Sequence, residues 1–271
     1  MRGMFTCGVI DVFMENGIDF EAACGISAGA VFGCNFKSRQ IGRPIRYNKK
    51  YSRDPRYSSI RSWIRTGDLY GEDFCYRQLP DELDPFDKET FRKNPMKFYV
   101  GATDLKTGKA VFYRCTDGGE KDLTWMRASA SMPLVSRIVK VDGYELLDGG
   151  IADSVPYRYM EKLGYTKNVI ILTQPKGYKK KKSAAMPLIR IALRRYPAVV
   201  ATMAKRHEIY NCQMTEINRR EADGSAFVIR PPKALGISRT EHDPEKLEQA
   251  YQTGRAEALR RLPELKKFLS V

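Results

Sequence analysis

A serine flanked by small residues in the segment Gly25-Ile26-Ser27-Ala28-Gly29 constrains the fold more than any other feature of the chain. Residues 20–24 have the composition of a short strand, and residues 28–36 have that of a small-residue helix. The pattern GxSxG at such a turn is typical of a nucleophile elbow, where only small neighbours let the strained turn close and expose the hydroxyl. We therefore predict that Ser27 is a nucleophile, with a glycine-rich packing turn as the alternative.

Helical and strand patterns alternate along the first 175 residues. Residues 96–115 predict a β-hairpin with its turn at 105–108, and residues 136–147 predict a second, shorter hairpin. An uninterrupted apolar run at 168–173 predicts a strand buried on both faces. Helices are predicted at 4–16, 43–52, 58–65, 122–130 and 155–163, and the last third is mostly helical, with one strand at 226–230 and helices within 244–269. This alternation predicts a layered α/β fold.

A catalytic serine needs a proton acceptor, and the chain has only two histidines, His207 and His242. We expect both on the solvated surface, although chain order would formally allow His242 to act as the base. Two Asp-Gly-Gly triplets offer a carboxylate instead. Asp117 lies in a polar stretch that indicates a turn, whereas Asp148 ends a predicted strand and is followed by glycines that let other backbone approach. Asp148 is therefore the candidate base, with an ordinary turn as the alternative.

The composition limits the class of protein. Hydrophobic residues make up 42% of the 271 residues and charged residues 29%, as in a globular protein. No apolar run reaches the roughly 18 to 20 residues of a membrane span, and Asp11 and Glu15 interrupt the stretch that a signal peptide would keep apolar. The six cysteines are scattered without a CxxC pair, which argues against a secreted disulfide scaffold. We expect a cytoplasmic protein.

Basic residues are concentrated in the C-terminal third. The formal net charge is +15, and residues 176–271 hold 21 Lys and Arg against 10 Asp and Glu. Within residues 176–206 there are ten basic residues and no acidic one. Such a segment favours an anionic partner, either nucleic acid or a membrane surface. A solvated charged face is the alternative.

Four motifs in order along the chain resemble the patatin-like phospholipase family. They are Arg2-Gly3, the GISAGA segment around Ser27, the segment Ala128–Pro133, and Asp148 within DGGIADSVP. The resemblance covers residues 1–175 and implies a three-layer α/β/α sandwich with a catalytic domain over that range. The basic, mostly helical region 176–271 is similar to an extension carried by one group of bacterial patatin-like proteins.

The resemblance also implies a reaction and roles for individual residues. It implies hydrolysis of lipid acyl esters by a serine–aspartate dyad, with Ser27 as nucleophile and Asp148 as base, and without a metal or cofactor. The remaining implied site residues are backbone oxyanion donors at Arg2, Gly3 and Ala28, elbow glycines Gly25 and Gly29, and the Gly149-Gly150 loop after the base.

This resemblance to lipid hydrolases makes the expected partner of the basic segment 176–206 more specific. Residues 186–206 mix apolar side chains with arginines and lysines, the composition of an interfacial amphipathic helix interrupted at Pro197. We expect this segment to bind an anionic membrane surface, so that the cytoplasmic protein is peripherally membrane-associated. We expect no nucleic-acid binding, because no recognised nucleic-acid motif is present. An amphipathic helix packed on the core is the alternative.

One departure from the family pattern affects the expected activity. The family's oxyanion loop has the form GGGxRG, and here only its end, Arg2-Gly3, is present. We therefore expect the chain as given to be short at its N-terminus, the sheet to lack a strand beside the nucleophile strand, and esterase activity to be weak. The alternative function is a catalytically weak or inactive membrane-surface binding protein on the same scaffold.

Overall fold

The main sheet is mixed, and its pairing brings two strand ends together. The computed structural model describes residues 1–270. The strands are β1 (Ala22–Ile26), β2 (Lys97–Asp104), β3 (Ala110–Cys115), β4 (Val139–Val141) and β5 (Tyr144–Asp148). β2 pairs with β3 along one edge, and its other edge is shared by β1, which runs parallel to it, and β5, which runs antiparallel. The carboxyl ends of β1 and β5 therefore point at each other along one edge of β2.

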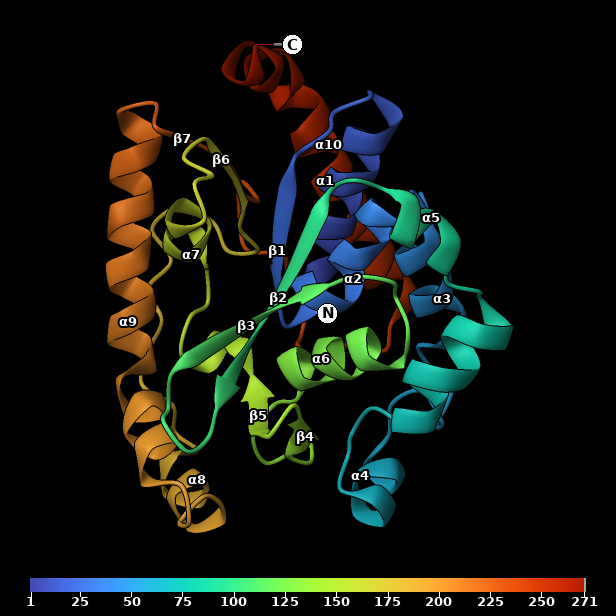
Figure 1. Ribbon diagram of the computed structural model, residues 1–271, viewed down its shortest axis with the longest axis vertical. Coiled ribbons are helices and arrows are strands. Elements are labelled where there is room, and N and C mark those ends of the chain that lie inside the picture. Colours follow the sequence, from blue (N-terminus) through green and yellow to red (C-terminus); the bar gives the residue numbers. More distant parts are fainter. Residues whose placement is uncertain (271) are drawn as a thin grey trace.

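Helices cover both faces of this sheet, which gives the expected three-layer α/β/α fold (Figure 1). On one face, β2 residues Phe98 and Val100 pack with side chains of α2 (Ala28–Lys37) and α6 (Glu120–Ala130). On the other face, Tyr159 of α7 (Tyr157–Lys162) stacks on Phe112 of β3, with ring centroids 3.7 Å apart. The remaining short helical elements are α3 (Arg43–Tyr51), α4 (Ile60–Thr66), a π-helical stretch at Phe74–Leu83, α5 (Lys88–Lys93) and a 3₁₀ turn at Gly149–Ile151.

The last helix, α10 (Pro244–Leu269), packs along the first, α1 (Gly3–Glu15). Glycines make their close approach possible. A Cβ atom on Gly254 would lie 2.0 Å from the carbonyl oxygen of Phe5, and one on Gly8 would lie 2.1 Å from that of Tyr251. The C-terminal region is therefore joined to the N-terminal helix by backbone-to-backbone packing.

The apolar run at 168–173 forms a second sheet rather than a strand of the main one. β6 (Asn168–Ile171) pairs in parallel with β7 (Ala226–Ile229). Ile170 is buried, but its neighbours Val169 and Ile171 are only partly buried. The prediction of burial on both faces is thus wrong for these two side chains, because β6 borders a cavity.

The basic segment contains α8 (Met186–Ala192) and the start of α9 (Pro197–Ala222), with the helix interrupted before Pro197 as predicted. Much of its apolar side packs on Leu105, Leu147 and Ile151 of the main domain; the residues that do so are Met186, Ile189, Leu193, Val199 and Met203. Leu188 and Ile191 of α8 remain exposed. Over residues 1–270, no helix has the length and apolarity required to span a bilayer.

Candidate active site

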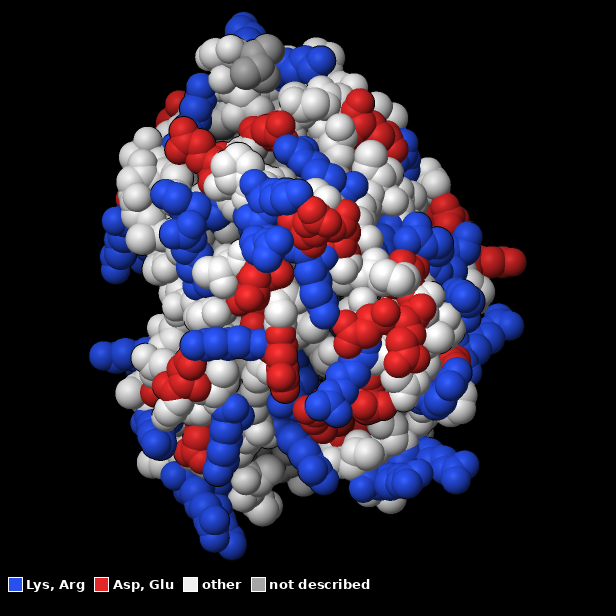
Figure 2. All heavy atoms as spheres, turned by 45° about the vertical axis from the view of Figure 1, so that its right-hand side comes forward, with Lys and Arg blue, Asp and Glu red and all other residues white. Residues whose placement is uncertain are grey.

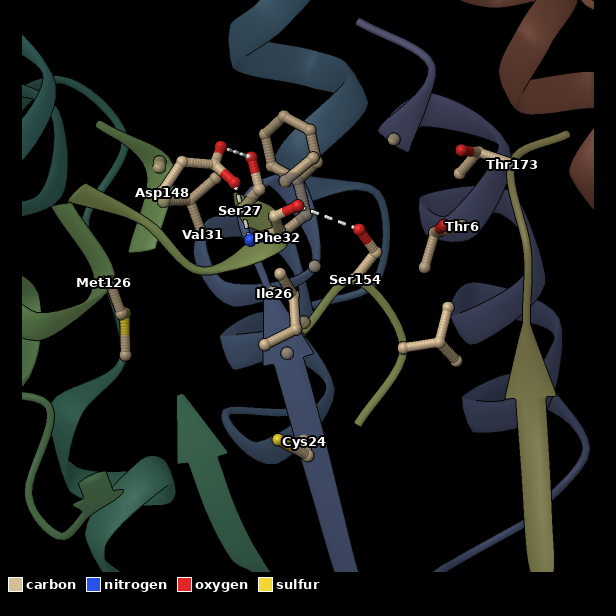
Figure 3. A pocket seen from close by; sticks show the side chains of 18 of the residues that line it. Thr6, Cys24, Ile26, Ser27, Val31, Phe32, Met126, Asp148, Ser154 and Thr173 are labelled. Carbon is tan, nitrogen blue, oxygen red and sulfur yellow. Dashed lines mark hydrogen bonds between the residues drawn. The ribbon is translucent and has the colours of Figure 1, made fainter. Parts of the chain in front are cut away.

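The pairing along β2 places Ser27 next to Asp148. Ile26, the last residue of β1, is the partner of Gly101, and Asp148, the last residue of β5, is the partner of the adjacent Ala102. Ser27 follows Ile26 directly, so its side chain emerges where the two strands meet end to end. The Oγ atom of Ser27 donates a hydrogen bond of 2.6 Å to Oδ2 of Asp148 (Figure 3).

Ser27 occupies a strained backbone conformation between β1 and α2. Its φ of 55° and ψ of −118° are unusual for a residue with a side chain. Gly25 is required for the turn to close, because a Cβ atom there would lie 2.3 Å from the carbonyl oxygen of Gly29. A Cβ atom on Gly29 itself would meet nothing within 4 Å. The steric reason for a small residue therefore holds at Gly25 and not at Gly29, which lines the open cavity.

Asp148 is held by hydrogen bonds at both ends. The Gly150 N–H donates to its Oδ1 at 2.7 Å, and the Thr103 hydroxyl donates to its backbone carbonyl at 2.9 Å. A Cβ atom on Gly149 would lie 2.1 Å from the carbonyl oxygen of Gly101, so this glycine is needed where the loop crosses β2. The predicted Gly149-Gly150 loop therefore positions the carboxylate.

The surroundings of Asp148 shift the pKa of its carboxyl group. Only 5% of the residue is exposed, and this burial raises the pKa of its carboxyl group. The Arg206 guanidinium opposes the rise most strongly, followed by the hydrogen bonds from Ser27 and Gly150. Arg206 is also fixed in place, because its Nε donates to the Gly150 carbonyl oxygen at 2.6 Å. A buried carboxylate with a raised pKa is a stronger base than an ordinary aspartate.

Two helix N-termini converge near Ser27. A Cβ atom on Gly3, the first residue of α1, would lie 2.7 Å from the Cβ atom of Ala28, the first residue of α2. The first N–H groups of a helix have no partner inside it, so those of Ala28 and Gly29 are available as donors at the positive end of the α2 dipole. The Ser27 N–H is already occupied, since it donates to the Ser129 hydroxyl at 2.9 Å.

Ser129 is a supporting residue to which the sequence assigned no role. Its hydroxyl donates to the Gly101 carbonyl oxygen at 2.6 Å while accepting from the Ser27 N–H, and so ties the Ser27 turn to β2. The signal that could have found it is its place in the Ala128–Pro133 segment, which was singled out only by resemblance.

The histidines are not hydrogen-bonded to Ser27. His242 is exposed as expected, and its Nδ1 lies 2.6 Å from the carbonyl oxygen of Ser52. His207 is half-buried and lines the cavity, so the prediction of a solvated surface position is wrong for it. Packing of α9 beside the loop that holds Asp148 brings His207 inward. Asp117 forms a turn as predicted, accepting a hydrogen bond from the Gly119 N–H.

A large cavity opens above the Ser27–Asp148 pair. Its volume is about 1520 Å³, above the roughly 300–1,000 Å³ of common ligand sites, because it continues as a slot between β1 and β6. Basic and aromatic side chains join its lining from the C-terminal region; they are Tyr178, Lys180, Arg206, Tyr210 and Arg239. Across residues 1–270, no group of three or more His, Cys, Asp and Glu side chains is arranged to hold a metal ion.

Comparisons with known proteins agree with the sequence resemblance. The family model described as patatin-like phospholipase matches residues 1–160, and a domain of unknown function, DUF6363, matches residues 196–270. The chain is 28% identical to the uncharacterized protein YjjU of Escherichia coli K12, over 64% of this chain and 49% of that protein. It is also 28% identical to the uncharacterized NTE family protein Rv1063c of Mycobacterium tuberculosis H37Rv, over 57% of this chain and 41% of that one.

The extent of these matches differs between the two kinds of comparison. The chain spans about half the length of the curated relatives it matches. The phospholipase family model, by contrast, matches more than half of this chain and includes both Ser27 and Asp148. The chain therefore belongs to the patatin-like phospholipase family of lipid hydrolases.

Proposed function

We propose that this protein is a lipid acyl hydrolase that uses Ser27 as nucleophile and Asp148 as its base. The observation that carries the proposal is the 2.6 Å hydrogen bond from Ser27 Oγ to a buried carboxylate at the meeting point of two strand ends. The strained Ser27 backbone and the adjacent α2 N-terminus support it, because both are features of serine esterase sites.

The proposed reaction needs no histidine. As Ser27 Oγ attacks the ester carbonyl carbon, its proton passes to Asp148 Oδ2, and the negative oxygen of the tetrahedral intermediate faces the N–H groups of Ala28 and Gly29. Collapse of the intermediate breaks the ester C–O bond, and the leaving alcohol takes the proton from Asp148. Water then attacks the acyl-enzyme, giving its proton to Asp148, which returns it to Ser27 as the fatty acid leaves.

We also propose an anionic membrane surface as the partner of the basic segment, at the end of the molecule formed by α4 and α8. Both helices lie at the lower end of the view in Figure 1. None of the α4 residues is buried, and Ile60, Ile64, Leu188 and Ile191 are each 62–76% exposed. Exposed aliphatic residues beside cations are typical of interfacial binding.

The charge at this end supports the same partner. Its exposed cations are Arg61, Arg65, Arg190, Arg194 and Arg195. None of the five forms an ion pair among residues 1–270, and the lower end of the face drawn in Figure 2 shows basic side chains with the acidic ones lying above them. Trp63 connects this end to the cavity, because its Nε1 donates to the carbonyl oxygen of Leu134, which lines the cavity.

A fluorophosphonate probe tests the hydrolase proposal. Such a reagent labels a serine that is activated by a neighbouring base, so we expect labelling of the unaltered protein and none of Ser27→Ala. Ser154→Ala is the matched control, because this hydroxyl also faces the cavity but donates to the Gly150 carbonyl oxygen; it should label normally. Labelling that persists in Ser27→Ala, or is absent from the unaltered folded protein, would contradict the proposal and favour a binding protein on this scaffold.

A further inference from the structure

Four cationic side chains surround the space above the Ser27–Asp148 pair. They come from distant parts of the chain; they are Arg2 before α1, Lys180 before α8, Arg206 on α9, and Arg239 before α10, named here the cationic cluster. All four line the same cavity as Ser27 and Asp148. Three of the four therefore come from the C-terminal region rather than from the part of the chain that carries the nucleophile.

Two members of the cluster, Lys180 and Arg206, are fixed by hydrogen bonds and a ring contact. The Lys180 N–H donates to Oδ1 of Asn211 at 2.8 Å, and Asn211 Nδ2 donates back to the Lys180 carbonyl oxygen at 3.0 Å. These bonds attach the Lys180 loop to α9. The Lys180 ammonium lies 4.5 Å from the ring centroid of Tyr210, and Arg206 is held by its bond to the Gly150 carbonyl oxygen. Lys180 and Arg206 are thus fixed in the wall of the cavity, whereas Arg239 lines the cavity as an exposed side chain.

One carboxylate, that of Asp148, acts through its charge on Arg206 and Lys180, but it forms no ion pair with any member of the cluster. Among residues 1–270, none of its four members lies within 4 Å of a carboxylate oxygen, although 19 pairs of Lys or Arg with Asp or Glu form elsewhere. Burial and the charges of its neighbours lower the pKa of Lys180 to about 8, and burial followed by the Arg239 charge lowers that of Arg2. Holding like charges together destabilises the fold unless an anion binds between them.

We propose that the cationic cluster is a phosphate subsite, which positions an acyl ester carrying a phosphomonoester group beside Ser27. This inference rests on the proposed hydrolase function for the identity of the reacting ester, and on the cluster alone for the phosphate. Guanidinium groups bind phosphate oxygens through paired N–H donors, and several cations around one anion suit a dianion. A zwitterionic headgroup fits poorly, because its ammonium group would face the same cations.

Phosphate binding is tested without catalysis. The probe is inorganic phosphate, titrated by calorimetry into folded Ser27→Ala protein at low ionic strength. We expect saturable binding that weakens roughly 10- to 100-fold in Arg239→Gln and in Lys180→Gln, because each loses a charged hydrogen-bond donor. Lys233→Gln is the matched control: it removes an exposed lysine that does not line the cavity, and should bind phosphate normally. No saturable binding, or an equal loss in all three variants, would overturn the proposal.

A second titration distinguishes the sources of the phosphate group. Dihexanoyl phosphatidate and dihexanoyl phosphatidylcholine carry the same acyl chains, so only their headgroups differ. A lipid headgroup in the site predicts that phosphatidate binds more tightly than both inorganic phosphate and phosphatidylcholine, and that Arg239→Gln removes this preference. Inorganic phosphate binding as tightly as phosphatidate would support a subsite for small phosphates. Equal binding of both lipids, unaffected by Arg239→Gln, would overturn the substrate assignment.

Failure of the hydrolase proposal leaves a different signature. In that case the fluorophosphonate labels no protein, yet phosphate still binds and Arg239→Gln still weakens it. Failure of the phosphate subsite alone gives the reverse result, with Ser27-dependent labelling and no phosphate binding.

Discussion

The two sides of the cavity are built differently. One side presents a neutral hydroxyl and a single buried carboxylate, Ser27 and Asp148, held by strand pairing and short turns. The other presents the cationic cluster, three of whose four members come from the C-terminal region. Under the proposed hydrolase function and the proposed phosphate subsite, the strand ends supply the bond-breaking chemistry, and the C-terminal region selects which anion lies beside it.

Removing the strand-end chemistry should have the largest effect. We expect Ser27→Ala and Asp148→Asn each to lower kcat/KM for a soluble neutral ester by at least about 1,000-fold, because the nucleophile and its base act as one unit. The double variant should lose little more than either single variant. Turnover is measured on protein shown to be folded by circular dichroism. Independent, multiplying losses in the double variant would show that Asp148 does not serve Ser27.

Displacing α10 from α1 should lower the stability of the protein rather than alter the Ser27–Asp148 pair. Gly254→Val introduces side-chain atoms where the Phe5 carbonyl oxygen leaves no space, so we expect a loss of about 3 kcal/mol in the free energy of unfolding. Gln252→Val is the control, because it places the same β-branched residue at an exposed position of the same helix. Urea unfolding measures both. Equal stability of the two variants would mean that α1 and α10 separate easily.

The sequence predicted the strand-end side well because its signals are local. Small residues around Ser27 and the strand before Asp148 each occupy one short segment, and the hairpin patterns placed β2 and β3 correctly. No local signal showed that β1 and β5 share an edge of β2. That fact follows from register, which depends on the whole sheet.

The helical side could not be predicted in the same way. The excess of basic residues was visible, but composition does not separate Lys180 and Arg206, which face the cavity, from Arg194, which is exposed. That division depends on how α8 and α9 pack on the sheet. The need for glycine at Gly8 and Gly254 likewise arises only from the close packing of α1 on α10.

Membrane binding should respond to charges that neither side of the cavity uses. Replacing Arg194 and Arg195 together by glutamine should weaken binding to anionic vesicles by roughly 30-fold, since each cation near such a surface contributes about 1 kcal/mol. Turnover of a soluble neutral ester should stay unchanged. Vesicle sedimentation at low and high salt provides the measurement. If the double variant binds anionic vesicles as tightly as the unaltered protein, the turn between α8 and α9 is not part of the membrane contact.

Arg206 belongs to both sides and should give the smallest effect, a shift in pH dependence. Its charge is the strongest influence holding down the pKa of Asp148, against burial, with smaller contributions from Ser27, Gly150 and Arg239. The base must be ionised to act, so activity falls as pH drops through that pKa. Arg206→Gln removes the opposing charge, which raises the pKa further and should move the acid limb of kcat/KM to higher pH.

We attribute the expected pH shift to the charge of Arg206 rather than to its hydrogen bond, and a second variant separates the two. Arg206→Lys keeps the positive charge and should leave the acid limb near its original position, whereas Arg206→Gln keeps only a donor for the Gly150 carbonyl oxygen. The measurement is a pH profile with a neutral soluble ester, so that loss of phosphate binding does not contribute. Equal displacement of the limb in both variants would assign the effect to the position of the Gly150 loop. A shift in Arg206→Gln alone would show that a cation on the helical side tunes the base on the strand side.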